Sequence, residues 1–375
     1  MFKDSLDMLL KLKRDILLKP LVLTNGFVDK KMTMPILSNV YIKKIHNNIT
    51  TIANDMEIQV SIISSGDMEG EDFTITLPGK KLQDILKIFT ENVDITFERQ
   101  DNKVLIKSGK TKFTLQSPPA EHYPLIKVHD DLICQFSINQ MILKGLIGQI
   151  QYAMADKDSR GFLNGMLFEV KNGQLNLVAT DAHRLGFATT PLSDTVPNSS
   201  TIIPRKTILE LYKLLEDSGE DLLIKIYPTQ VFFETSSKQL ITKVIDGKYP
   251  DYERVIPMSN DKLCLINRQN LLQAVDRVSV IGIDKLKTIT FDLSYNKLAI
   301  SCHNEEQEDS RDELEVEFAY ETALKVNFNI NYVRELLSNS ESEYLQWAFF
   351  DGQRSVLVTI PNETDFKSVI MPLRA

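Results

Sequence analysis

Three stretches of the chain place apolar residues at the i, i+3 and i+4 spacing of an amphipathic helix. Their sequences are RDILLKPLVL from Arg14, NQMILKGLIG from Asn139 and NRQNLLQAVDRV from Asn267. The same apolar pair recurs in each stretch, at Leu17 and Leu18, Ile142 and Leu143, and Leu271 and Leu272, and it is followed by Leu21, Leu146 and Val275. The pattern predicts one helix that is written three times.

A second helical pattern recurs in KKLQDILKIF, RKTILELYKLL and INYVRELLS. Its matching positions are spaced by about 125 residues, as expected for a repeated unit. They are Leu82, Ile85 and Leu86, then Ile208, Leu211 and Tyr212, then Val333, Leu336 and Leu337. Each repeat is therefore expected to hold two helices.

The remaining pattern is extended, with a turn pair followed by alternating apolar residues in NNITTIAND, NGQLNLVATD and YNKLAISCHN. Asp55 and Asp181 occupy the same place in two of these strands. Further hairpins such as VLIKSGKTKFTLQ and VFFETSSKQLITKV complete the unit. The sequence predicts an α+β protein with three repeated domains of two helices on antiparallel sheets, at residues 1–130, 131–258 and 259–375, divided by the polar turns KVHDDL and PMSNDK.

Composition narrows the class of protein. The chain has 375 residues, of which 43% are hydrophobic, and a net charge of −8 that taken alone argues against a nucleic-acid partner. Cys134, Cys264 and Cys302 show no paired spacing and favour a reducing cytoplasm. The N-terminus lacks the apolar core of a signal peptide, and no apolar run is long enough for a membrane span. We expect a cytoplasmic protein.

Basic residues nevertheless gather on the predicted helices, while acidic residues are concentrated in the segment from Asn304 to Glu317. A solvated face explains such a bias on any single helix, but six helices with the same bias favour a polyanion held through its phosphates. Two copies of three such units, with helices about 9 Å apart, would line a circle some 35 Å across, wide enough for a duplex. The residues expected to face DNA are Arg14, Lys19, Lys80, Lys81, Lys144, Arg205 and Lys206, with Arg268, Arg277 and Arg334 biased in the same way.

The stretch LVATDAHRLG, residues 177–186, groups several polar and ionisable side chains within a few positions. Asp181 and His183 could be a metal pair or a general acid and base, but the five histidines form no HExxH or closely spaced ligand set. Instead of catalysis, these side chains could stabilise the end of a strand or form a site that recognises a partner. Two rival functions therefore stay open beside DNA binding: a metal-dependent DNA hydrolase that uses Asp181 and His183, and a repeat scaffold that binds only proteins.

Several longer motifs resemble the bacterial DNA polymerase III beta subunit family, the sliding clamps. They are SRGFLNGMLFEV with LVATDAHRLG, DGKYPDYERVIP, the terminal VIMPLRA, and also MTMPILSNV and NFNINYVRELL. The resemblance implies a head-to-tail homodimeric ring that encircles duplex DNA and tethers the polymerase III core and other proteins with a clamp-binding motif. It further implies opening by a separate clamp loader, and neither a cofactor nor catalytic activity of the clamp itself.

The resemblance also implies a peptide-binding pocket between the second and third domains. Its expected residues are Arg160, Leu163, Thr180, His183, Arg184, Leu185, Pro250, Arg254, Val255, Asn329, Tyr332, Ser355, Val369, Ile370, Met371, Pro372, Leu373 and Arg374. Apolar members would form the floor, and His183, Arg184, Arg254 and Arg374 would bond the peptide. Asp181 is expected to hold a turn. The chain departs from the family at Ala182, where a glycine is usual, at Leu286, where an aromatic residue is usual, and in its last three residues.

For the dimer, Phe113 and Leu115 are expected to alternate outward on the strand KFTLQ of the first domain. The resemblance supplies Val280 and Ile281 of the third domain as their counterpart.

Overall fold

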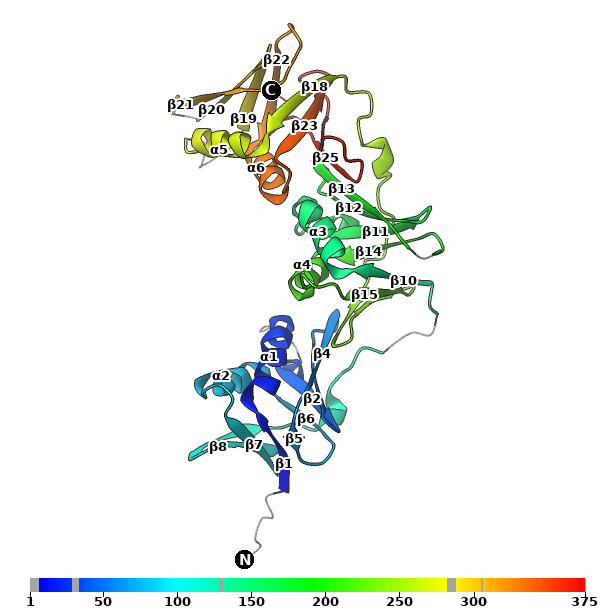
Figure 1. The fold of residues 1–375 in the computed structure, drawn as a ribbon, viewed down its shortest axis with the longest axis vertical. Helices are drawn as coiled ribbons and strands as arrows, with labels where there is room; N and C mark the ends of the chain where they lie inside the picture. The colour runs from blue at the N-terminus through cyan, green and yellow to red at the C-terminus, as the bar shows by residue number, and fades with distance from the viewer. Residues whose placement is uncertain are drawn as a thin grey trace, which may run out of the picture. The chain divides into compact units, whose positions relative to one another are not determined.

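A computed structural model describes residues 7–28, 34–127, 131–193, 195–281, 288–304 and 306–374 (Figure 1). Leu286 and Ala375, two of the positions that depart from the family, lie outside the described residues. Two compact units form, one from Met1–Asn139 with Gly219–Lys243 and the other from Gln140–Ser218 with Val244–Ala375. The division into three domains at residues 130 and 258 stays a prediction.

The first unit contains two antiparallel sheets. One has five strands in the order β5 (Met68–Glu69), β1 (Asp7–Lys13), β7 (Asp94–Gln100), β8 (Lys103–Ser108) and β9 (Thr111–Gln116). The other has eight strands in the order β10 (Cys134–Asn139), β15 (Asp221–Ile226), β16 (Gln230–Glu234), β17 (Lys238–Lys243), β4 (Ile58–Ser65), β3 (Asn48–Asn54), β2 (Asn39–Ile45) and β6 (Phe73–Pro78). The helices of this unit are α1 (Arg14–Thr24) and α2 (Gly79–Ile88).

The second unit also contains two antiparallel sheets. Its eight-stranded sheet has the order β14 (Ser199–Pro204), β11 (Gly165–Lys171), β12 (Gln174–Thr180), β13 (Arg184–Pro191), β25 (Phe366–Ile370), β24 (Val356–Thr359), β23 (Tyr344–Phe349) and β18 (Lys262–Asn267). Its four-stranded sheet has the order β21 (Asp309–Glu315), β20 (Lys297–His303), β19 (Thr288–Ser294) and β22 (Leu324–Asn329). The helices are α3 (Gln140–Ile150), α4 (Arg205–Leu214), α5 (Arg268–Ser279) and α6 (Ile330–Asn339).

The predicted α+β class with repeated helix pairs is confirmed. Figure 1 shows the helices in pairs, α1 with α2, α3 with α4, and α5 with α6. The second helices of the pairs begin at Gly79, Arg205 and Ile330, within one residue of where the pattern predicted.

The predicted register of the first helices is wrong by one residue in the middle repeat. Leu17, Leu143 and Leu271 are each the fourth residue of their helix and are buried, whereas Ile142 is 46% exposed. Leu17 therefore corresponds to Leu143, and Leu21 to Ile147. Two adjacent apolar residues made both alignments compatible with the sequence, and only burial separates them.

The first residue of each of these helices ties it to its partner helix. Arg14 donates to the backbone oxygen of Phe89 at 2.5 Å, just past the end of α2, and Arg268 donates to that of Leu337 at 3.0 Å in α6. Gln140 accepts a bond from the backbone N–H of Glu216 at 3.3 Å, just past α4. A cation near the last carbonyls of a helix satisfies groups that have no partner within the helix. The prediction that Arg14 faces DNA is wrong, because its side chain is only 9% exposed and also pairs with Asp15.

Asp55 and Asp181 form the same turn in two repeats, as predicted for Asp181. Oδ1 of Asp181 accepts the N–H groups of His183 and Arg184 at 2.9 and 3.0 Å, and Oδ1 of Asp55 does the same for the equivalent residues of its repeat. The residue after each aspartate has a φ of 73°, in the left-handed region that favours glycine. In the second unit that residue is Ala182, so the turn keeps its shape without the glycine usual in the family.

Candidate peptide-binding site

The end of the stretch LVATDAHRLG continues into β13, and β13 pairs with β25 near the C-terminus. Arg184 pairs with Ile370 and Leu185 with Val369 where β13 lies against β25. Beyond the strand, the N–H of Met371 donates to the backbone oxygen of His183 at 2.9 Å. Residues far apart in the chain thus lie side by side in the middle of the eight-stranded sheet of the second unit.

A cavity of about 270 Å³ opens above this strand pair. Apolar and aromatic side chains dominate its lining, and Val255 and Met371 are 39% and 40% exposed. Apolar groups left partly open to water in a concave site are typical of ligand binding. The lining residues are Arg160, Phe162, Leu163, Thr180, Ala182, His183, Arg184, Leu185, Pro250, Tyr252, Val255, Val369 and Met371.

Part of the expected pocket does not line this cavity. Ile370 is buried in the sheet, and Asn329 caps α6 by accepting the N–H of Asn331 at 2.9 Å. The other expected residues outside the lining are Arg254, Tyr332, Ser355, Pro372, Leu373 and Arg374. Conversely, Phe162 and Tyr252 line the cavity and were missed, although both stand in the quoted motifs SRGFLNGMLFEV and DGKYPDYERVIP.

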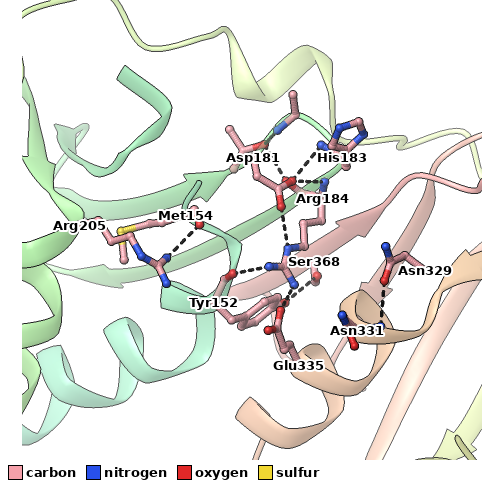
Figure 2. Close-up of polar contacts among 12 residues, drawn as sticks. Tyr152, Met154, Asp181, His183, Arg184, Arg205, Asn329, Asn331, Glu335 and Ser368 are labelled. Atoms are coloured by element: carbon pink, nitrogen blue, oxygen red, sulfur yellow. Dashed lines mark hydrogen bonds and ion pairs between the residues drawn. The ribbon is translucent and has the colours of Figure 1, made fainter. Parts of the chain in front are cut away.

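Arg184 has a different role from the one expected. Its guanidinium is held by the protein, donating to Oδ2 of Asp181 at 3.0 Å and to the backbone oxygen of Tyr152 at 2.7 Å, and pairing with Glu335 (Figure 2). It also lies over the rings of Tyr332 and Tyr152, at 4.5 and 5.2 Å from their centres. With 9% of its side chain exposed, Arg184 has little capacity left to bond a peptide.

This network connects elements from distant parts of the second unit. Tyr152 lies in η4 (Gln151–Ala153), directly after α3, whereas Glu335 and Tyr332 lie on α6. The Tyr152 hydroxyl is 3.0 Å from that of Ser368 on β25 (Figure 2). Burial raises the pKa of the Tyr152 phenol to about 12, so it stays a neutral hydrogen-bonding group at physiological pH. The network holds α6 against the strand that forms the floor of the cavity.

The polar residues His183 and Arg160 at the rim of the cavity differ in how firmly other side chains hold them. His183 is exposed and stacks on Tyr332, with ring centres 6.3 Å apart. Arg160 forms a bidentate ion pair with Asp158, and its hydrogen bonds lower the pKa of that carboxyl to about 2. The Asp158 turn is also held by Asn164, which places Leu163 of η5 (Gly161–Leu163) in the lining.

The basic residues of the helices divide into two sets. Lys19, Lys80, Lys81 and Lys206 are exposed, although Lys80 also pairs with Asp84 at 2.8 Å. Lys144 pairs with Asp217 at 2.9 Å, and Arg205 donates to the backbone oxygen of Met154 at 2.9 Å (Figure 2). Arg277 and Arg334 pair with Asp312 and Asp276. The bias of the helices therefore includes several arginines with structural partners.

The residues expected at the dimer contact differ in how exposed they are. Val280 is 67% exposed beyond the end of α5, as a contact residue should be. Leu115 is only 9% exposed, and Phe113 packs edge-on against Phe89 at 6.1 Å. Leu115 is therefore buried and does not point outward as predicted, whereas Phe113 is partly exposed beside Phe89 and its place in the contact stays a prediction.

Within the described residues, no three His, Cys, Asp or Glu side chains gather in a group able to hold a metal ion. Burial raises the pKa of the Cys264 thiol to about 12. Among the helices of the described ranges, none is long and apolar enough to span a bilayer.

The chain is thus a repeat protein of helix pairs on antiparallel sheets, with an apolar cavity where β13 meets β25. Models of the N-terminal, central and C-terminal domains of the DNA polymerase III beta subunit match residues 8–127, 137–251 and 253–374. The chain belongs to this family, the bacterial DNA sliding clamps.

Known relatives match this chain over nearly its whole length. A beta sliding clamp of Pseudomonas aeruginosa is 35% identical over 369 residues, covering 97% of this chain and 99% of the relative. The beta sliding clamp of Escherichia coli is 29% identical and covers 96% and 98%. A crystal structure of the Pseudomonas aeruginosa clamp bound to griselimycin superposes with a TM-score of 0.95 at 34% identity, covering 98% of this chain and 100% of that one.

Proposed function

We propose that this clamp closes as a head-to-tail homodimer around duplex DNA in the cytoplasm and holds the replicative polymerase, the clamp loader and other partners through the cavity above β13 and β25. It needs no cofactor and catalyses no reaction itself. The observation that carries the proposal is the half-open apolar cavity, whose floor is built by segments from the central and C-terminal family domains. A Leu or Phe side chain of a short peptide fits such a floor, and the polarizable Met371 adapts to varied partners.

The hydrolase alternative is not favoured by the geometry of Asp181. One oxygen of its carboxylate accepts two backbone N–H groups, and the other accepts the Arg184 guanidinium. An aspartate with both oxygens engaged in this way supports the turn rather than a metal ion or a reacting water.

Topological linkage to DNA is the direct test of the ring. We expect the protein, once loaded by its clamp loader, to stay on nicked circular DNA during gel filtration in high salt and to be released when the circle is linearised. Retention on linear DNA of the same length would contradict encirclement, and no retention on either form would favour the scaffold alternative.

The proposed dimer joins two strands at sheet edges. Within the described residues β9 pairs only with β8, and β21 only with β20. Exposed edges are hazardous unless they are covered, and the two carry opposite charge, with Lys110 and Lys112 on one side and the acidic DSRDELE on the other. We propose that β9 of one protomer lies along β21 of its partner, with Val280 and Ile281 beside the contact.

Replacing Val280 by Ala and Ile281 by Asp together should yield monomers, because it removes exposed apolar area and places a charge in the contact. Light scattering after gel filtration at micromolar concentration measures the mass against 42.8 kDa for one chain. Ile142→Asp is the control, since Ile142 is 46% exposed on α3 and belongs to neither strand of the proposed contact. A double variant that remains dimeric would rule out this contact.

DNA is expected to be held by many weak phosphate contacts. Reversing Lys81, Lys144 and Lys206 to Glu together should weaken binding most at low salt and reduce the slope of log K against log salt by about one unit for each lost contact. A variant with Lys43, Lys248 and Lys325 reversed changes the net charge equally without touching a helix. An unchanged slope in the helix variant, measured by fluorescence anisotropy on duplex DNA, would count against the helices as the DNA-facing surface.

A further inference from the structure

A second cavity, of about 370 Å³, opens in the same unit, and its lining shares only Tyr252 with that of the first. Its lining residues are Lys171, Asn172, Gln174, Asn176, Phe187, Tyr252, Glu253, Ile256, Met258 and Lys367. They come from the β11–β12 hairpin, from β13 and β25, and from η6 (Tyr252–Arg254) with the segment that follows it.

Tyr252 is the wall that the two cavities share. It lines both, and its ring stacks on Phe187 with centres 5.8 Å apart. Its hydroxyl donates to Glu169 at 2.6 Å, which fixes the ring in place. Leu185, Phe187, Tyr252 and Val369 belong to one buried apolar cluster. The two cavities are therefore adjacent openings over the same core, separated by the short η6 helix.

The second cavity combines exposed apolar surface with positive charge. Met258 is 74% exposed, and Ile256 packs on the shared cluster. The ammonium of Lys367 lies 4.8 Å from the centre of the Phe187 ring and donates to the backbone oxygen of Thr364 at 3.2 Å. No carboxylate of the described residues pairs with it. Lys171, in contrast, pairs with Glu253 at 2.5 Å.

We propose that the second cavity binds the segment of a partner polypeptide that flanks the peptide held in the first. The segment presents an apolar side chain to Ile256 and Met258 and a carboxylate to Lys367. The inference rests on the proposed function, because the partner is anchored in the first cavity. Two linked contacts on one chain bind more tightly than either alone, since the second contact forms at a high effective concentration.

Extended peptides test the proposal by anisotropy with the full chain. The core probe is a clamp-binding peptide of the replicative polymerase, and Gly-Gly-Asp-Ile-Asp is added to its N-terminus in one probe and to its C-terminus in another. One of the two extensions is expected to tighten binding at least tenfold, whereas Gly-Gly-Lys-Ile-Lys at the same end is not. Both acidic probes binding within twofold of the core would overturn the proposal.

Charge reversal at the cavity identifies where the extension lies. Lys367→Glu should transfer the preference from the acidic to the basic extension, and Met258→Asp should remove the gain, with binding of the core peptide unchanged in both variants. Lys43→Glu is the matched control, because Lys43 is exposed on β2 and lines neither cavity. A gain that survives both variants would overturn the proposal. A core peptide that fails to bind the wild type would instead overturn the proposed function, and this inference with it.

Discussion

Removal of residues 371–375 is expected to lower the affinity for a clamp-binding peptide about ten- to a hundredfold and to leave the fold intact. The deletion takes away Met371, which lines the cavity and bonds His183 through its backbone. Burying one Leu or Phe side chain is worth about 1.5–3 kcal/mol, and each 1.4 kcal/mol is tenfold in affinity. Strand β25 ends at Ile370, so its pairing with β13 is kept. Titration calorimetry with a polymerase-derived peptide measures the effect.

A shorter deletion is the control for this prediction. Removing only Arg374 and Ala375 should leave the affinity unchanged, because Arg374 does not line the cavity. The cavity would have to be rejected as the peptide site if the longer deletion bound the peptide as tightly as the intact chain. The oligomeric state in solution should be the same for both deletions and the intact chain.

Replacing Arg184 by Met should destabilise the second unit by about 3 kcal/mol, near the lower limit for breaking a buried ion pair. The substitution keeps the apolar length of the side chain but leaves Asp181 without its cation and the backbone oxygen of Tyr152 without its donor. Glu335 is 46% exposed and regains water, which limits the cost. Trp347, the single tryptophan, is buried in the second unit, so its fluorescence reports unfolding in urea.

An exposed arginine of the same unit provides the comparison. Arg254 is 87% exposed and pairs with Asp251, so Arg254→Met should change the free energy of unfolding by less than about 0.5 kcal/mol. Arg184→Lys should fall between the two, because an ammonium cannot reproduce the fork of bonds that the guanidinium makes. Equal urea midpoints for Arg184→Met and the wild type would show that the network in Figure 2 does not stabilise the packing of α6 against β25.

Local spacing was sufficient to predict the repeated elements. The apolar positions of the helices and the turn pairs of the hairpins depend on residues a few positions apart, so they can be read from the chain directly. The turn at Asp181 was predicted in the same way, from its match with Asp55. The one error in register came from the adjacent Ile142 and Leu143, since apolar spacing alone does not distinguish which of two neighbours is buried.

The direction of charged side chains could not be read in this way. Arg14 and Arg184 look like free cations in the sequence, yet both donate to backbone oxygens supplied by distant segments. Leu115 shows the same difficulty for an apolar residue, because alternation predicts that it shares a face with Phe113 but not how deeply each of the two is buried.

The sequence by itself determined the repeated helix pairs, the antiparallel hairpins and, through motifs in a conserved order, the family. These features follow from short-range spacing and from residue identity. Only the tertiary structure decided that β25 pairs with β13, that Tyr252 and Phe162 line the cavity, and that Arg184 is committed to Asp181, Glu335 and Tyr152. Each of these depends on contacts between segments far apart in the chain, where burial and hydrogen-bond geometry, rather than residue type, select the partner.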